Sequence, residues 1–78
     1  MLTGGQIRAG RALARITGAE LAEAAGISVP TVKRLEAMAG PVSSNSSTET
    51  AIRRALSARG VIVLDENGEG PGVRLRKE

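Results

Sequence analysis

Apolar residues recur at intervals of three and four over the first sixty positions of the chain, a period that predicts short amphipathic helices. The first helix is expected to begin after Thr3, because Thr3 and Gln6 have the spacing of a capping box, and to run to about Arg15. Its inward-facing stripe is predicted to be Ile7, Gly10, Leu13 and Ala14. One face of this helix should therefore pack on the rest of the chain.

Two more short helices are predicted on either side of Gly26. A second capping box, from Thr17 to Glu20, starts a helix that Gly26 ends, since glycine adopts the left-handed cap conformation with little strain. Ser28 is placed to cap the next helix, where Pro30 falls in the first turn and removes no intrahelical hydrogen bond. The inward residues of that helix are expected to be Val32, Leu35 and Ala39, before Gly40 and Pro41 end it.

The pattern changes in the last third of the chain. A polar connection over residues 42–48 precedes a fourth predicted helix, which Gly60 ends. Residues 61–64 are a β-branched run that is apolar on both faces, and residues 73–76 alternate apolar and basic side chains, so both segments are typical of strands. The glycine-rich residues 66–72 between them are typical of a turn.

These elements predict a small, mainly α protein, with a four-helix domain over residues 1–60 and a short C-terminal β extension, a strand or a hairpin, over residues 61–78. The chain has 78 residues, of which 41% are hydrophobic and none is aromatic, so its core is aliphatic and limited in area. Without cysteine or histidine it has neither a disulfide nor the usual zinc ligands to stabilise so small a fold. Self-association is the expected source of added stability.

The formal net charge is +3, and its placement matters more than its size. Residues 1–60 carry eight basic and four acidic side chains, whereas residues 61–78 carry three and four. A basic helical block favours a polyanionic partner such as nucleic acid. No stretch approaches the roughly 20 apolar residues of a spanning helix, and the first ten residues lack the order of a signal peptide, so a cytoplasmic location is expected.

The spacing of Ala22, Gly26, Ile27, Val32 and Leu35 resembles the helix-turn-helix of the lambda-repressor-like, Cro and XRE-type family of transcriptional regulators. In such a motif the small alanine lets the second helix cross the first closely, the glycine makes the turn, and the three aliphatic residues fill the shared core. The resemblance implies double-stranded DNA as the partner, with the second helix of the motif in the major groove.

The resemblance also implies which residues contact DNA. Those of the recognition helix are Ser28, Val29, Pro30, Thr31, Lys33 and Arg34. Lys33 and Arg34 suit the two acceptors of guanine, whereas Val29 and Pro30 offer apolar contact to a thymine methyl group. Contacts to phosphate are expected at the start of a helix and in the serine-rich loop, at Thr17, Gly18, Ser43, Ser44 and Asn45. An Arg11–Glu36 pair is implied as scaffolding.

Each of these assignments has a simpler alternative. Lys33 and Arg34 are also explained as solvated charges on a helix face, and the serine-rich loop as a flexible connection. Arg53 and Arg54 are interpreted as surface charges.

The C-terminal extension is predicted to join two chains. A run that is apolar on both faces needs cover that so small a chain hardly provides, so the dimer interface is expected at Val61, Ile62, Val63, Leu64, Val73 and Leu75. The alternative is a hairpin within one chain, and the two are compatible because such a hairpin still has an exposed edge. A homodimer would place two recognition helices about 34 Å apart, matching inverted half-sites.

The function predicted from these features is a sequence-specific DNA-binding transcriptional regulator, a repressor acting as a homodimer on an inverted-repeat operator. The alternative is an antitoxin or antiactivator whose main partner is another protein. An enzyme is not favoured, because the chain has no His, Cys or Tyr and its carboxylates are not paired with a nucleophile at a recognisable spacing. No catalytic residue, cofactor, metal or membrane partner is expected.

Overall fold

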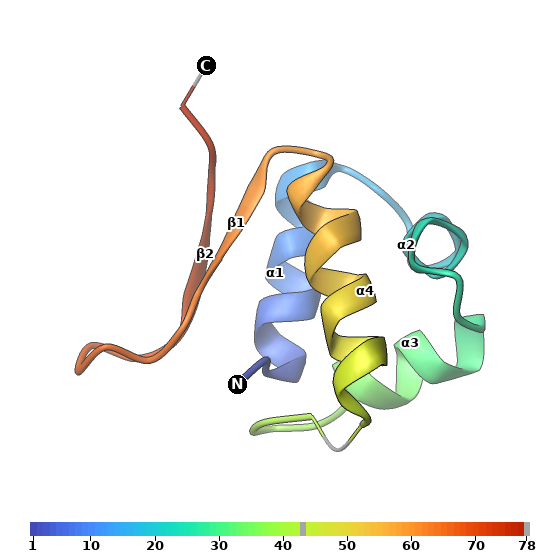
Figure 1. Ribbon diagram of the computed structural model, residues 1–78, viewed down its shortest axis with the longest axis horizontal. Helices are drawn as coiled ribbons and strands as arrows, with labels where there is room; N and C mark the ends of the chain where they lie inside the picture. The colour runs from blue at the N-terminus through green and yellow to red at the C-terminus, as the bar shows by residue number, and fades with distance from the viewer. Residues whose placement is uncertain (43, 78) are drawn as a thin grey trace.

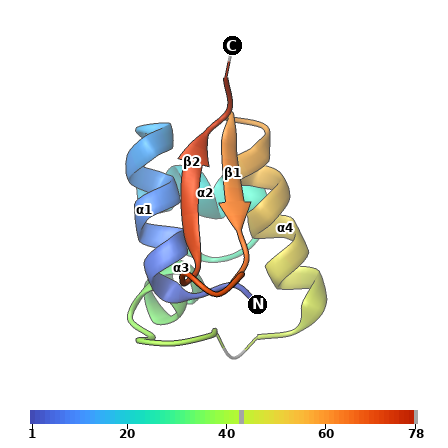
Figure 2. The same ribbon diagram turned by 90° about the vertical axis from the view of Figure 1, so that its left-hand side faces the viewer.

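The computed structural model describes residues 1–42 and 44–77, which form a mainly helical fold with a small antiparallel sheet. In chain order the elements are α1 (Gly4–Ala14), α2 (Gly18–Ala25), α3 (Val29–Glu36), α4 (Ser46–Ser57), β1 (Val61–Leu64) and β2 (Gly72–Leu75). Helices α1 and α4 lie side by side in the middle of the molecule, with α2 and α3 on one side and the β1–β2 hairpin on the other (Figure 1). Figure 2 shows the hairpin lying across α1 and α4.

The helices begin where their capping residues predict. The Thr3 hydroxyl accepts a hydrogen bond from the Gln6 amide at 3.1 Å, and the Gln6 side chain accepts one from the Thr3 amide at 2.8 Å, which completes the predicted capping box. Thr17 starts α2 through a second capping box, and the Ser28 hydroxyl caps α3. These three predicted helix starts are confirmed.

Helix α4 begins earlier than predicted. The Asn45 side-chain oxygen accepts a hydrogen bond from the Thr48 amide at 2.8 Å, so Asn45 is the N-cap. Residues 46–48, which were expected to belong to the polar connection, form the first turn of the helix instead. The serine-rich composition of this segment obscured a cap that a single asparagine provides.

Helix α3 ends at Glu36, not at Gly40 as predicted, and Ala39 is exposed and does not belong to an inward stripe. The reason is that residues 40–42 run extended along the start of the chain. The Val42 amide donates to the Leu2 carbonyl at 2.8 Å, and the Gly4 amide donates to the Gly40 carbonyl at 3.4 Å. A helical backbone would not present these groups to the neighbouring segment.

The core is aliphatic, as predicted, and draws on all four helices, β1 and the start of the chain. Its buried members are Leu2, Ile7, Leu21, Ala22, Val32, Leu35, Ile52, Ala55, Leu56 and Val61. Leu13 was expected to face inward on α1 but is among the exposed large apolar residues. Val61 is 1% exposed, so its side chain is covered within its own chain and is not available for the predicted contact with a partner.

The two strands pair with each other, as the alternative of an internal hairpin predicted. The register is antiparallel and joins Val61 to Leu75 and Leu64 to Gly72, so β2 begins one residue before the predicted strand. The Gln6 amide nitrogen donates to the Leu64 carbonyl at 2.7 Å and to the Gly72 carbonyl at 3.1 Å. Gln6 is 3% exposed, so one buried side chain both caps α1 and fixes the turn end of the hairpin.

A charged network links α4 to the end of β1. The Arg53 guanidinium donates to Asp65 at 2.8 Å and to Glu49 at 3.3 Å, while Glu49 accepts from the Leu2 amide at 2.9 Å. The hydrogen bond between Arg53 and Asp65 lowers the pKa of Asp65 and raises the pKa of Arg53. Arg53 therefore has a structural role that its interpretation as a surface charge did not include.

Gly4 should be intolerant of any side chain, because α1 begins directly against the end of α3. A Cβ at Gly4 would lie 2.6 Å from the Leu35 carbonyl oxygen and 3.0 Å from that of Glu36, too close for either backbone. We expect Gly4→Ala to lower the free energy of unfolding by about 1–3 kcal/mol, measured by urea denaturation.

The neighbouring Gly5 provides the matched control for Gly4→Ala. A Cβ there would meet nothing nearer than 3.8 Å. Gly5→Ala should leave stability unchanged or raise it by about 0.5–1 kcal/mol through helix propensity. Equal effects of the two substitutions would contradict the close approach of α1 and α3.

Candidate functional site

The turn between α2 and α3 depends on the backbone conformation of Gly26. Its φ is +70°, in the left-handed region, and its amide donates to the Ala22 and Glu23 carbonyls that end α2. A Cβ would meet no atom within 4 Å, so the requirement for glycine comes from the dihedral angle and not from crowding. This turn sets the direction in which α3 leaves α2.

The inner face of α3 is fixed in the core. Val32 and Leu35 are 1% and 0% exposed and pack with Leu21 and Ala22 of α2. Val29 is half-buried and also packs against the core, so much of its side chain faces inward. These contacts leave the opposite face of α3 turned away from the rest of the chain.

The outer face of α3 is exposed and carries two cations. Pro30, Lys33, Arg34 and Ala37 are all exposed, and their spacing of three, four and seven residues places them on one side of the helix. Ser28 is exposed at the N-cap, and its hydroxyl lies 2.7 Å from that of the half-buried Thr31. Ala37 was not among the predicted contacts, although its spacing from Pro30 and Lys33 would have identified it.

The far end of α3 is tied to α1 by arginine. The Arg11 guanidinium donates to both carboxylate oxygens of Glu36, at 2.8 and 3.1 Å, and to the Ile16 carbonyl at 3.3 Å. The hydrogen bond to Glu36 raises the pKa of Arg11. Arg8 donates to the Glu36 carbonyl oxygen at the end of the same helix. The implied pairing of Arg11 with Glu36 is present, and it holds α3 from the end opposite to Gly26.

The residues predicted to contact phosphate lie at the starts of two other helices. Thr17 and Gly18 begin α2, while Ser44 and Asn45 precede α4, and Ser43 lies outside the described residues. Hydrogen bonds from the backbone and side chain of Thr17 lower the pKa of Glu20, whose carboxylate accepts from the Thr17 amide at 2.8 Å. The structure therefore separates the sequence-predicted residues into an outer face of α3 and two helix starts.

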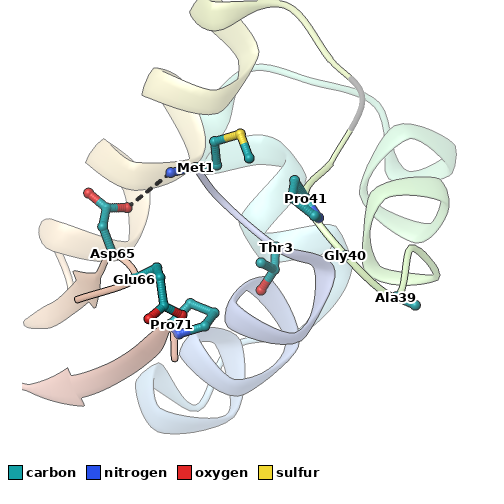
Figure 3. Close-up of a pocket in the computed structure, with 8 residues that line it drawn as sticks. All are labelled: Met1, Thr3, Ala39, Gly40, Pro41, Asp65, Glu66 and Pro71. Carbon is teal, nitrogen blue, oxygen red and sulfur yellow. Dashed lines mark hydrogen bonds and ion pairs between the residues drawn. The ribbon is translucent and has the colours of Figure 1, made fainter. Parts of the chain in front are cut away.

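A cavity of about 570 Å³ lies elsewhere, between the start of the chain, the segment after α3 and the hairpin turn (Figure 3). Its lining residues are Met1, Thr3, Ala39, Gly40, Pro41, Asp65, Glu66 and Pro71. The Asp65 carboxylate in it already accepts from Arg53 and from the Met1 amine, and the Thr3 hydroxyl accepts from Gln6. Asp65 and Thr3 are thus held in hydrogen bonds within the chain.

Residues 1–42 and 44–77 contain neither a candidate metal site nor a candidate membrane span. No group of three or more His, Cys, Asp or Glu side chains is arranged to hold a metal ion. No helix in this part of the chain combines the length and apolar character that crossing a membrane requires.

Comparison of the chain with protein-family models finds no match, and no curated protein matches it.

The Arg11–Glu36 pair is expected to stabilise the fold. The two side chains are 29% and 13% exposed, so either partner left alone would be a poorly solvated charge. Glu36→Gln should lower the free energy of unfolding by about 1–3 kcal/mol. Arg11→Met should lower it less in the Glu36→Gln background than in the wild-type chain. Glu23→Gln, at an exposed position of α2, is the control and should have little effect. Additive losses would contradict the coupling.

The capping box of α2 should make stability depend on acid pH. The pKa of Glu20 in the folded chain is lowered from its ordinary 4.5, so the ionised carboxylate stabilises the fold above that pH. As pH falls through 4.5 and below, Glu20 is protonated first in the unfolded chain, and this stabilisation is lost. Glu20→Gln keeps an acceptor for the Thr17 amide but does not titrate, so its denaturation midpoints should change less between neutral and acid pH. Ala24→Gln, which leaves the capping box intact, should retain the wild-type acid dependence; equal behaviour of all three proteins would contradict the assignment.

Proposed function

We propose that this chain is a sequence-specific, double-stranded DNA-binding transcriptional regulator of the lambda-repressor-like kind, with α3 as its recognition helix. The observation that carries the proposal is the division of α3 into two faces. Its inner face is buried through Val32 and Leu35, while its outer face presents Lys33 and Arg34 to solvent. A helix held in this way can enter a major groove about 12 Å wide without disturbing the core.

The base contacts are assigned to the outer face of α3. Lys33 and Arg34 present donors to the O6 and N7 acceptors of guanine. Pro30 and Ala37 are exposed on the same face and offer apolar surface to thymine methyl groups. Ser28 supplies a hydroxyl at the helix start, whereas the half-buried Val29 and Thr31 have smaller parts in this proposal.

The phosphate contacts are assigned to the starts of α2 and α4. The first amides of a helix attract an anion because they have no intrahelical acceptor and lie at the positive end of the helix dipole. At α2 these are the amides that follow Thr17, and at α4 those that follow Asn45. Such contacts orient the protein on the duplex and carry no sequence information.

Regulation is proposed to follow from occupancy of the site. A chain bound through α3 would act by excluding other proteins from the same DNA in the cytoplasm. Such exclusion favours repression. The proposed DNA surface lies on α3, on the side of α1 and α4 opposite the hairpin (Figure 1).

The proposal is tested by selecting a bound duplex from a random pool and measuring its affinity. The selected sequence should bind at least about a thousandfold more tightly than a scrambled one, and the affinity should fall steeply with salt. Arg34→Ala should lose about 1–3 kcal/mol of binding, confined to one base position. Arg54→Ala, an exposed arginine of α4, is the matched control and should retain the sequence preference.

Equal affinity of the wild-type chain for selected and scrambled duplex would contradict the proposal. If Arg34→Ala keeps the wild-type preference at every base position, Arg34 does not contact a base. A chain that selects no duplex but captures a protein through α3 would support the antitoxin or antiactivator alternative.

A further inference from the structure

The outward face of α1 combines small apolar residues with arginines. Ala9, Ala12 and Leu13 are exposed on it, at spacings of three and four residues that place them on one side of the helix. Arg8 and Arg15 are exposed at the two ends of this run. The buried residues of α1 lie on its other side, so this is the face that the helix turns away from the core.

Leu13 adjoins the open end of the hairpin. It lies three residues after Gly10, where the missing side chain lets the hairpin come close, since a Cβ there would be 3.5 Å from the Val61 side chain. Val61 pairs with Leu75 across the hairpin, so Leu75 lies beside the last turns of α1. Figure 2 shows β2 as the strand nearer to α1, with both elements ending at the top. The outward face of α1 therefore continues onto the end of β2.

An apolar patch results from this arrangement. Leu75 is 53% and Leu13 is 36% exposed, and both are among the exposed large apolar residues of the described chain. A single exposed leucine is ordinary on a protein surface, but here two leucines lie on one face and the exposed Ala9 and Ala12 extend it. An apolar patch with a polar rim is typical of a site that binds another molecule.

The charged side chains of α1, of its C-cap and of β2 are all arginines. Arg8, Arg15 and Arg74 are exposed around the apolar patch. Neither α1 nor β2 contains an acidic residue, and Glu36 beside α1 is already bonded to Arg11. The described acidic residues of the hairpin lie in the turn at its other end, as Asp65, Glu66 and Glu69. We call this surface the α1–β2 face, and its residues are Arg8, Ala9, Ala12, Leu13, Arg15, Arg74 and Leu75.

Arg15 has a backbone conformation that arginine rarely adopts. Its φ is +59° and its ψ is 43°, in the left-handed region, and the other described residues with positive φ are all glycines. Glycine or asparagine would end α1 with less strain. The Arg15 side chain is exposed and makes no hydrogen bond or ion pair with another described residue. Apart from placing a cation at a helix C-terminus, arginine contributes little to the fold here, and a contact with another molecule accounts for its presence.

We propose that the α1–β2 face binds an acidic, amphipathic peptide segment of another protein. Aliphatic side chains of the segment cover Leu13 and Leu75, and its carboxylates pair with the exposed arginines around them. The face shares no residue with the outer face of α3, and the inference does not rest on the binding of DNA.

The composition of the face selects this class of partner. Exposed leucines gain nothing from a phosphate backbone, so a nucleic acid would use the arginines and leave the apolar patch uncovered. A second copy of this chain would set arginines against arginines across the contact, which is destabilising. An anionic membrane surface is met by larger apolar and aromatic side chains, whereas the chain has no aromatic residue. A segment with both carboxylates and aliphatic side chains is complementary to the whole face.

The contact is small and should be weak. One exposed helix face and the end of one short strand bury less than the roughly 1,200 Å² of a stable complex. Dissociation constants between about 10 μM and about 1 mM are therefore expected for a single segment.

The probe for this site is a labelled synthetic peptide of about 14 residues, with leucine at every third or fourth position and glutamate elsewhere. Fluorescence anisotropy should show that the wild-type chain binds it within the expected range. The same peptide with lysine in place of glutamate, or with serine in place of leucine, should bind at least about tenfold more weakly. No binding of the leucine–glutamate peptide, or equal binding of the three peptides, would overturn the inference.

Two variants on β2 separate the apolar and the charged parts of the contact. Leu75→Thr keeps a β-branched residue in the strand, and Arg74→Glu reverses an exposed charge, so both should keep the wild-type melting temperature. Each should bind the leucine–glutamate peptide about tenfold more weakly, and Arg74→Glu should bind the lysine peptide more tightly than the wild type does. Arg54→Glu, the same charge reversal at an exposed position of α4, is the matched control and should bind like the wild type.

Arg15→Gly tests whether arginine at the C-cap serves binding. Glycine relieves the left-handed strain, so this variant should melt no lower than the wild type, yet bind the leucine–glutamate peptide more weakly by about threefold to tenfold. Arg15→Lys keeps the charge and should bind like the wild type. Wild-type affinity in Arg15→Gly, Leu75→Thr and Arg74→Glu, or an equal loss in Arg54→Glu, would overturn the inference. Binding to phosphatidylglycerol vesicles that Leu75→Thr abolishes, without binding to the peptide, would assign the face to a membrane instead.

Discussion

The outer face of α3 depends on the burial of its inner face. Val32 and Leu35 lie in the core, the left-handed turn at Gly26 sets the start of the helix, and the Arg11–Glu36 pair ties its end to α1. With both ends and one side fixed, the helix has little freedom to rotate, and the other side must face solvent. The position of every candidate contact, from Ser28 to Ala37, follows from this constraint.

The start of the chain organises the remainder of the fold. Gln6 closes the capping box of α1 and binds two carbonyls of the hairpin, and Gly4 lets the same helix approach the end of α3 closely. The first turn of α1 therefore contacts both the end of α3 and the hairpin. Helix α3 and the hairpin lie on opposite sides of α1 and α4 (Figure 1).

Most local features were predictable from the sequence, with the Asn45 cap of α4 as an exception, whereas most contacts between distant segments were not. The caps at Thr3, Thr17 and Ser28 depend on residues within one turn, so their spacing identified them correctly. The end of α3 and the role of Gln6 depend on pairing with segments that are tens of residues away, which no local pattern reveals. For the candidate site, Lys33 and Arg34 were placed on the exposed face as expected, while burial of Val29 depends on packing that only the fold defines.

The outer face of α3 is proposed to be the surface that meets DNA. The most direct test is to record backbone amide chemical shifts while a selected duplex is added to the labelled chain. We expect the largest changes in residues 28–37, smaller ones in residues 17–20 and at the start of α4, and little change in the hairpin. Changes centred on residues 61–75, with α3 unaffected, would contradict it.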